Sequence, residues 1–131
     1  FLPGTFKATD RFVRASFYIN AVEQTSDARL AAASVFSVIR QTSVPWGISI
    51  PGQPNLSTTR WRVVADHLDR RYYVESVTSP SIFWVDLANL DLTEGAPVMK
   101  LDLGVDMERM LNGETSASFE PAAPFTFQPA D

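Results

Sequence analysis

The chain has 131 residues, 45% of them hydrophobic and 20% charged, so it can form one globular domain but not an enzyme with a separate cofactor domain. Its 11 Lys and Arg residues against 15 Asp and Glu residues give a net charge of -4, which argues against a nucleic acid partner, and no apolar run reaches the roughly 20 residues that a membrane span requires. The chain has no Cys and one His, His67, which excludes a disulfide, a thiolate metal site, a cysteine nucleophile of its own and any site that needs two imidazoles.

Two helices are predicted at the start of the chain. Residues 9–22 are rich in apolar side chains and predict a helix buried on more than one side, with Thr9 or Asp10 as its N-cap. A second, amphipathic helix is predicted after its expected N-cap Ser26, because apolar residues then recur at spacings of three and four up to Ile39. About four residues separate the two helices, which indicates an antiparallel hairpin.

A long loop follows the second helix. Residues 44–58 contain three Pro and two Gly, which neither a helix nor a central strand accommodates. Ordered loops of this length are often functional, so we expect this one to form a substrate-facing rim. Its one large side chain, Trp46, either anchors the loop to the core or lines a ligand pocket, and the residues alone leave both readings open.

After the loop, the sequence pattern predicts an antiparallel meander of short strands. The four predicted strands cover residues 59–66, 71–77, 82–87 and 98–103. In the first of them Trp61, Val63 and Ala65 share one face, and the segment from His67 to Arg70 predicts a turn. A sheet face rich in Trp, Val and Tyr needs a partner layer that two helices supply only in part, so we expect further sheet outside this chain.

The last segment has no regular pattern. It is expected to be an extended tail that contains Phe119, Phe125 and Phe127. Three Phe residues are unusual in a solvated tail, so we expect this segment to lie along the body of the protein or along a neighbouring subunit. The chain is thus expected to form a single α+β domain fragment with a helical hairpin (1–43), a loop (44–58), antiparallel strands (59–103) and a tail (104–131).

Few residues are candidates for chemistry. His67 lies between Asp66 and Asp69, so it could act as a general base that a carboxylate orients. A residue in a surface turn is the simpler interpretation. The acidic residues show no metal-ligand spacing and the glycines are isolated, so neither a metal nor a cofactor is expected.

Arg11 is the strongest candidate. It lies in the first turn of a strongly apolar helix, where a guanidinium is difficult to keep in water unless the helix start opens into a cavity. From the residues alone, a surface residue or a structural partner of Asp10 is the favoured interpretation of Arg11, ahead of a functional role. Arg14, one turn further along the helix, has the same status for weaker reasons.

A family resemblance changes the interpretation of Arg11. The segment LPGTFKATDRFVRA at residues 2–15 resembles the Leu-Pro-Gly and Asp-Arg-Phe-hydrophobic-Arg stretch of the choloylglycine hydrolase family, which includes penicillin V acylases and bile salt hydrolases. The segments VFSVIRQTSVPWGI, STTRWRVVADHLDRRYYVESVTSP and FWVDL resemble the helix, loop and strands that follow in the family. The similarity covers about the first 105 residues and is nearer to penicillin V acylase-like members of Gram-negative bacteria.

The resemblance implies the C-terminal part of a four-layer αββα N-terminal-nucleophile hydrolase. In such enzymes a Cys at the mature N-terminus attacks a linear amide, such as the side chain of penicillin V or an N-acyl homoserine lactone. Phe1 cannot act as that nucleophile, so the Cys, the acidic partner of its amine and the oxyanion-hole Asn would lie outside this chain. The family's catalytic Arg maps onto Arg11. The resemblance further implies a small-molecule amide substrate, a homo-oligomer, often a homotetramer, and a bacterial periplasmic location.

A non-catalytic reading remains as the alternative. A chain with two helices, a meander and an aromatic-rich loop is also typical of a ligand-binding or assembly domain. In that reading Trp46, Trp61 and Trp84 would form a hydrophobic contact surface.

Overall fold

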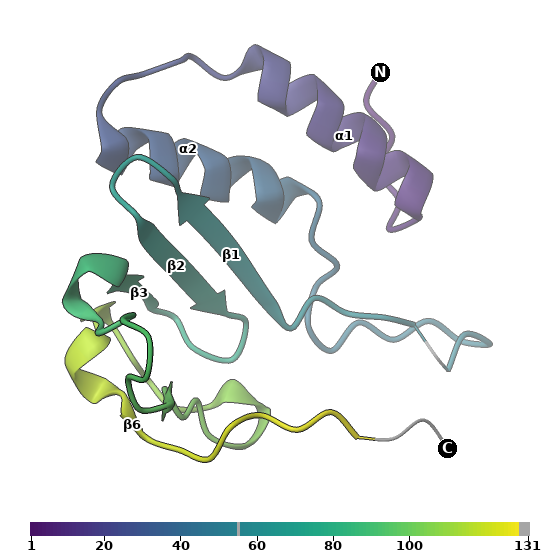
Figure 1. Ribbon diagram of the computed structural model, residues 1–131. Coiled ribbons are helices and arrows are strands. Elements are labelled where there is room, and N and C mark those ends of the chain that lie inside the picture. Colours follow the sequence, from purple (N-terminus) through teal and green to yellow (C-terminus); the bar gives the residue numbers. More distant parts are fainter. Residues whose placement is uncertain (55, 129–131) are drawn as a thin grey trace.

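The computed structural model describes residues 1–54 and 56–128. Two helices, α1 (Ala8–Ala21) and α2 (Ala28–Gln41), run in opposite directions above a sheet, and the C-terminal segments lie on the other side of that sheet (Figure 1). The remaining elements are β1 (Trp61–Asp66), β2 (Arg71–Ser76), β3 (Ile82–Asp86), η1 (Leu87–Asn89), β4 (Met99–Lys100), η2 (Val105–Met107), β5 (Gly113–Glu114), η3 (Ser116–Ser118) and β6 (Glu120–Pro121). In the described part of the chain, no helix is long and apolar enough to cross a membrane.

Helix α1 starts earlier than predicted. Its N-cap is Lys7, whose side chain makes no capping bond, so the prediction of Thr9 or Asp10 as cap is wrong. The carboxylate of Asp10 instead accepts hydrogen bonds from the hydroxyl and, at 3.3 Å, the backbone N–H of Thr5. The hydrogen bond from the Thr5 hydroxyl holds the pKa of Asp10 below its ordinary value. Asp10 therefore fixes the turn that precedes the helix.

Helix α2 is capped one residue later than predicted. Asp27, not Ser26, is the N-cap, and its Oδ1 accepts from the N–H of Leu30 at 3.0 Å. A carboxylate in this position binds an N–H group that has no partner within the helix and also interacts favourably with the helix dipole. Buried Phe36 faces the sheet, whereas buried Val38 lies on the side where α1 packs against α2.

Replacing Asp27 by Ala is expected to lower the free energy of unfolding by about 1 kcal/mol, because Leu30 loses its acceptor. Chemical denaturation of the intact protein measures this change. Ser26→Ala is the matched control, since Ser26 is exposed and is not the cap. Equal losses in the two variants would contradict the assignment of Asp27.

The main sheet has the strand order β1-β2-β3-β5. Its first three strands form the predicted antiparallel meander, whereas β5 runs parallel to β3. The predicted turn between β1 and β2 is present, and Asp66 stabilises it by accepting hydrogen bonds from the N–H groups of Leu68 and Asp69, both at 3.0 Å.

The helices cover one face of the sheet, and the C-terminal segment covers part of the other. Tyr73 packs edge-on against Phe36 of α2, with ring centroids 6.4 Å apart, which places this face of β2 under the helices. On the opposite face Val74 pairs with Val63 and Phe83, and the C-terminal segment covers Phe83. The buried apolar residues are Phe36, Val38, Val44, Val64, Val74, Phe83 and Val85.

The opposite face is left open along β1. Trp61 is 57% exposed and Tyr72 43% exposed, and Val63 and Ala65 beside them are also exposed. This open apolar face fits the expectation that the sheet needs a further partner layer.

The fourth predicted strand differs most from the sequence-based expectation. Only Met99 and Lys100 form a strand, and they pair with Pro121 and Glu120 in a separate two-stranded sheet. The tail is also more ordered than expected, because η2, β5 and η3 lie within it. Ser81 Oγ donates to the carbonyl of Leu111 at 2.9 Å and so helps to hold this segment on the β2–β3 connection. Phe125 and Phe127 make an edge-to-face contact, with ring centroids 4.9 Å apart, but both remain exposed.

Candidate active site

Arg11 is partly buried and lies where α1 meets the end of α2. Its Nε donates to the carbonyl oxygen of Thr42, the C-cap of α2, at 2.6 Å. The last carbonyls of a helix lack intrahelical partners and carry negative partial charge, so a guanidinium is favourable there. Among the described residues, neither Nη1 nor Nη2 of Arg11 has a hydrogen-bond partner. The predicted pairing of Arg11 with Asp10 does not form, because Asp10 binds Thr5.

Two cavities adjoin at Arg11. One, of about 430 Å³, lies between the start of α1 and the 44–58 loop, and the other, of about 320 Å³, lies between the loop and the start of β1. Both are lined by Arg11, Val44 and Ser57. Lys7 lines the first cavity and Arg60 the second, while no acidic side chain of the described residues lines either one. The groove is therefore cationic and suited to a group that carries or develops negative charge.

Arg14 has a different role from Arg11. Its Nη1 donates to the carbonyls of Pro3 and Thr5 at 2.8 and 2.9 Å, and its Nε donates to the carbonyl of Gln41 at 2.9 Å. Arg14 thus connects the N-terminal segment to the end of α2. Its guanidinium is committed to backbone carbonyls, whereas that of Arg11 uses one nitrogen.

The structure places His67 far from a catalytic arrangement. The residue is exposed in the β1–β2 turn, where neighbouring Asp66 accepts from the backbone N–H groups of Leu68 and Asp69. Within the part of the chain described, no group of three metal-ligating side chains comes together.

Trp46 lies beside Arg60 rather than in the core. The guanidinium carbon of Arg60 is 4.3 Å from the centroid of the Trp46 ring, and the indole is 50% exposed. Trp46 does not line either of the two cavities at Arg11. It therefore anchors the loop through a cation–π contact with Arg60, the second residue after that loop.

The proposed surface of three Trp residues does not form. The register pairs Trp61 with Ser76 and Trp84 with Tyr73, and these two partners lie on opposite faces of β2. Trp84 packs against Tyr73 on the side of the helices, with ring centroids 5.7 Å apart. Trp61 lies on the other face, so one contact surface cannot include both.

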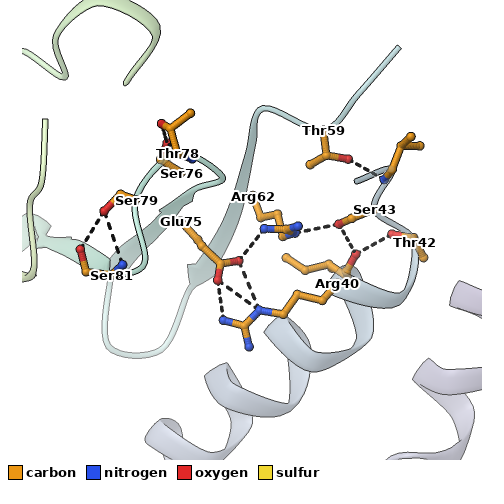
Figure 2. A network of polar contacts seen from close by, with 12 residues as sticks. Arg40, Thr42, Ser43, Thr59, Arg62, Glu75, Ser76, Thr78, Ser79 and Ser81 are labelled. Atoms are coloured by element: carbon orange, nitrogen blue, oxygen red, sulfur yellow. Dashed lines mark hydrogen bonds and ion pairs between the residues drawn. The ribbon is translucent and has the colours of Figure 1, made fainter. Parts of the chain in front are cut away.

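A partly buried ion-pair network lies next to the site (Figure 2). Glu75 of β2 accepts from Arg40 Nη2 at 2.6 Å and from Arg62 Nη1 at 2.9 Å. Arg62 Nε in turn donates to Ser43 Oγ at 2.7 Å, directly beside Thr42. The network thus ties the end of α2, which holds Arg11, to β1 and β2.

Sequence reasoning missed Glu75 and Arg60. For Glu75 a signal exists, because Arg62 and Glu75 are direct cross-strand partners once the β1–β2 turn sets the register. For Arg60 a weaker signal exists, because the paired ends of the loop are Val44 and Thr59. Trp46 lies two residues inside these ends and Arg60 lies one residue outside them. The acceptor of Arg11 is a backbone carbonyl, which no side-chain pattern reveals.

Comparisons with known proteins identify the fold and the family. A family model for linear amide C-N hydrolases of the choloylglycine hydrolase family matches residues 1–105. The chain is 43% identical, over 96% of its length, to a penicillin V acylase of Pectobacterium atrosepticum. The solved structure of a penicillin V acylase from Agrobacterium tumefaciens matches with a TM-score of 0.91 and 48% identity over 99% of the chain.

The chain corresponds to only part of these relatives. It covers 37% of the length of the Pectobacterium protein and 41% of the Agrobacterium chain. Its two helices followed by antiparallel strands form the α+β arrangement of the matched part of the penicillin V acylase, an N-terminal-nucleophile hydrolase fold. The fold and the family match together show that this chain belongs to the choloylglycine hydrolase family of linear amide C-N hydrolases.

Proposed function

We propose that this chain is the C-terminal part of a linear amide hydrolase of the penicillin V acylase type. The family match and the two relatives named penicillin V acylase support this activity. Since the chain contains no Cys, its nucleophile would come from a segment outside it, and the relatives, which are more than twice as long, provide for such a segment.

The observation that carries the proposal is the position of Arg11. The Nε of Arg11 is fixed on Thr42, and the residue lines two adjoining cavities that have no acidic side chain among their described lining residues. A cation that is held in this way needs little reorganisation when negative charge develops beside it. A residue that only capped α2 would not need a groove at its free end.

The family resemblance implies the reaction. The α-amino group of the N-terminal Cys takes the thiol proton, and the thiolate attacks the carbonyl carbon of the amide. The C–N bond breaks as the leaving amine takes a proton, which leaves an acyl-enzyme. Water then attacks the acyl-enzyme and releases the acid and the thiol. Arg11 stabilises the thiolate and the negative charge on the carbonyl oxygen during both attacks.

The substrate belongs to the class of N-acyl compounds with a linear amide. The side-chain amide of penicillin V is the first candidate, because both matched relatives carry the name penicillin V acylase. N-acyl homoserine lactones have the same amide and form the second candidate. We also propose a homo-oligomer in the bacterial periplasm, as the family resemblance implies.

Alkylation of the active enzyme tests the proposal. Intact mass and N-terminal sequencing of the active preparation are expected to find a polypeptide with Cys as its first residue. One equivalent of iodoacetamide per active site is expected to abolish hydrolysis of penicillin V, and substrate present during the reaction should protect against this loss. Size-exclusion chromatography and cell fractionation of the same preparation report the oligomeric state and compartment. Full activity in a preparation without Cys would refute the proposal.

A further inference from the structure

The 44–58 loop is tied to the body of the protein at its neck. Val44 N–H donates to Thr59 Oγ1 and Thr59 N–H donates to the carbonyl of Val44, both at 3.0 Å. Beyond the neck, the loop extends away from the end of the sheet where β1 begins (Figure 1). The bonds within it are local, from Ile48 to Pro45 at 3.4 Å and from Gln53 to Ile50 at 3.0 Å. The neck therefore sets where the loop starts, and something else must fix its direction.

Arg60 contacts the loop beyond the neck. Its backbone carbonyl accepts from the N–H of Val77 at 3.1 Å, which continues the β1–β2 pairing and fixes its Cα on the sheet. Its guanidinium stacks on Trp46 at 4.3 Å, and its Nη2 forms an ion pair with Asp106. The Arg60 clamp, defined by Trp46, Arg60 and Asp106, thus joins the loop, the sheet and the C-terminal segment.

Asp106 is presented to Arg60 by a strained turn. Asp106 and Met107 have positive φ angles of 54° and 61°, which are uncommon for residues other than Gly. The carbonyl of Met107 accepts from the hydroxyls of Ser76 and Thr78 at 3.2 and 3.1 Å, and these bonds hold the turn on the end of β2. Such backbone conformations persist where the surrounding contacts determine them.

Arg60 makes two side-chain contacts in the clamp, an ion pair with Asp106 and a stack on Trp46, and they differ in expected strength. The Asp106 side chain is 71% exposed, and exposed ion pairs add little because water screens them. Trp46 is 50% exposed, but a cation–π contact contributes measurably even at exposed sites, whereas many exposed ion pairs contribute nothing measurable. Asp106 therefore orients the guanidinium, and the stack fixes the loop.

The loop forms one wall of the groove at Arg11. Gln53, Pro54 and Leu56 line the larger cavity opposite Arg11. Arg60 itself lines the smaller cavity, but one face of its guanidinium is occupied by Trp46 and its Nη2 by Asp106. It is thus poorly placed to bind a substrate anion and well placed to hold the loop.

We propose that Arg60 is a positioning residue that, through its stack on Trp46, fixes the 44–58 loop as the wall of the substrate groove. This inference rests on the proposed amide hydrolase activity for its kinetic consequence. Because the loop provides binding surface and no reacting group, the clamp sets substrate affinity and leaves the chemical step unchanged.

The test uses the full-length enzyme with Arg60→Gln and Trp46→Leu. Each substitution is expected to raise KM for penicillin V roughly threefold to tenfold, with kcat within about twofold of the wild type. Hydrogen exchange followed by mass spectrometry is expected to show loop amides exchanging at least about fivefold faster, with α1 and α2 unchanged. The double variant should be no worse than either single one, because both changes break the same contact.

Three variants control this test. Trp46→Phe keeps an aromatic face and should stay close to the wild type. Asp106→Asn tolerates the left-handed backbone and removes only the exposed ion pair, so its effect should be the smallest within the clamp. Arg29→Gln removes the same charge from an exposed position on α2 and should change nothing.

Hydrogen exchange tests the Arg60 clamp, and the kinetics test its role in the proposed function, so the two proposals can fail separately. Unchanged loop exchange in Arg60→Gln would overturn the clamp whatever the enzyme hydrolyses. Faster exchange together with a loss of kcat at constant KM would overturn the positioning role. If the wild type hydrolyses no amide, the proposed function fails, and the exchange rates of the loop still decide the clamp.

Discussion

Replacing Arg11 by Ala in the full-length enzyme is expected to lower kcat for penicillin V by roughly 100-fold to 1000-fold, the usual cost of removing one fixed charge donor beside a developing anion. KM should change much less, because the charge that Arg11 stabilises is absent from the bound ground state. Single-turnover measurements of acyl-enzyme formation locate the effect in the chemical step. A kcat within about threefold of the wild type would contradict the catalytic assignment.

A structural role for Arg11 makes a different prediction. If Arg11 only caps α2, Arg11→Ala removes one hydrogen bond to the carbonyl of Thr42. Stability would then fall by about 1.5–3 kcal/mol while each folded molecule kept its turnover. Activity must therefore be expressed per folded molecule, with the folded fraction taken from circular dichroism and a thermal melt.

Two further variants separate charge from geometry. Arg11→Lys keeps a positive charge but loses the fork of donors that joins Thr42 to the groove, so a partial recovery of kcat is expected. Arg14→Ala is the matched control, since Arg14 donates to three backbone carbonyls and lies one turn away on the same helix. It should reduce stability and leave kcat per folded molecule unchanged.

The periodic elements of the fold could be predicted from the sequence. Both helices and the three-stranded meander follow from local hydrophobic spacing, and the observed register puts Trp61, Val63 and Ala65 on one face, as their alternation indicates. Each pairing that was not predicted involves at least one strand of two residues and joins distant parts of the chain, such as β5 beside β3 and β6 beside β4. A two-residue strand has no periodicity to detect, so only the folded chain reveals it.

Helix starts were predicted less well than helix interiors. Thr9, Asp10 and Ser26 all have suitable cap chemistry, and which residue caps depends on where the preceding backbone turns. In α1 the carboxylate of Asp10 accepts a hydrogen bond from the hydroxyl of Thr5, so the helix begins without a side-chain cap.

The candidate site could be predicted only in part. The residues alone left Arg11 as a surface or structural residue, and the family resemblance singled it out. What gives Arg11 its position is the end of α2, fixed in turn by contacts between residues more than ten positions apart, such as Arg62 with Ser43 and Arg40 with Glu75. These contacts depend on how α2 crosses the sheet, which the sequence pattern does not specify.

Glu75 helps to fix how α2 crosses the sheet, because it binds both Arg40 of α2 and Arg62 of β1. Its side chain is 15% exposed and that of Arg62 is 17% exposed, so both charges lie largely out of water. Replacing Glu75 by Gln is expected to lower the free energy of unfolding by about 2–4 kcal/mol, because it leaves Arg62 partly buried without a counter-charge. Urea denaturation of the full-length enzyme at pH 7 measures this loss.

The pH dependence of stability provides a second measurement. Burial by itself raises the pKa of Glu75, but the hydrogen bonds and charges of Arg40 and Arg62 outweigh it and hold the pKa below the ordinary value of 4.5. The folded state therefore binds fewer protons than the unfolded state between these two values. The stabilisation is complete above pH 4.5 and is lost as the pH falls through the folded-state pKa.

The difference between the wild type and Glu75→Gln isolates this contribution from other carboxylates with lowered pKa values, such as Asp102 and Glu114. The difference in unfolding free energy is expected to be constant above pH 4.5 and to shrink below it. Lys100→Gln, which breaks an ion pair more than half exposed on both sides, should change stability by less than about 0.5 kcal/mol. A Glu75→Gln variant as stable as Lys100→Gln, or a difference that does not shrink in acid, would show that α2 is held on the sheet by apolar packing alone.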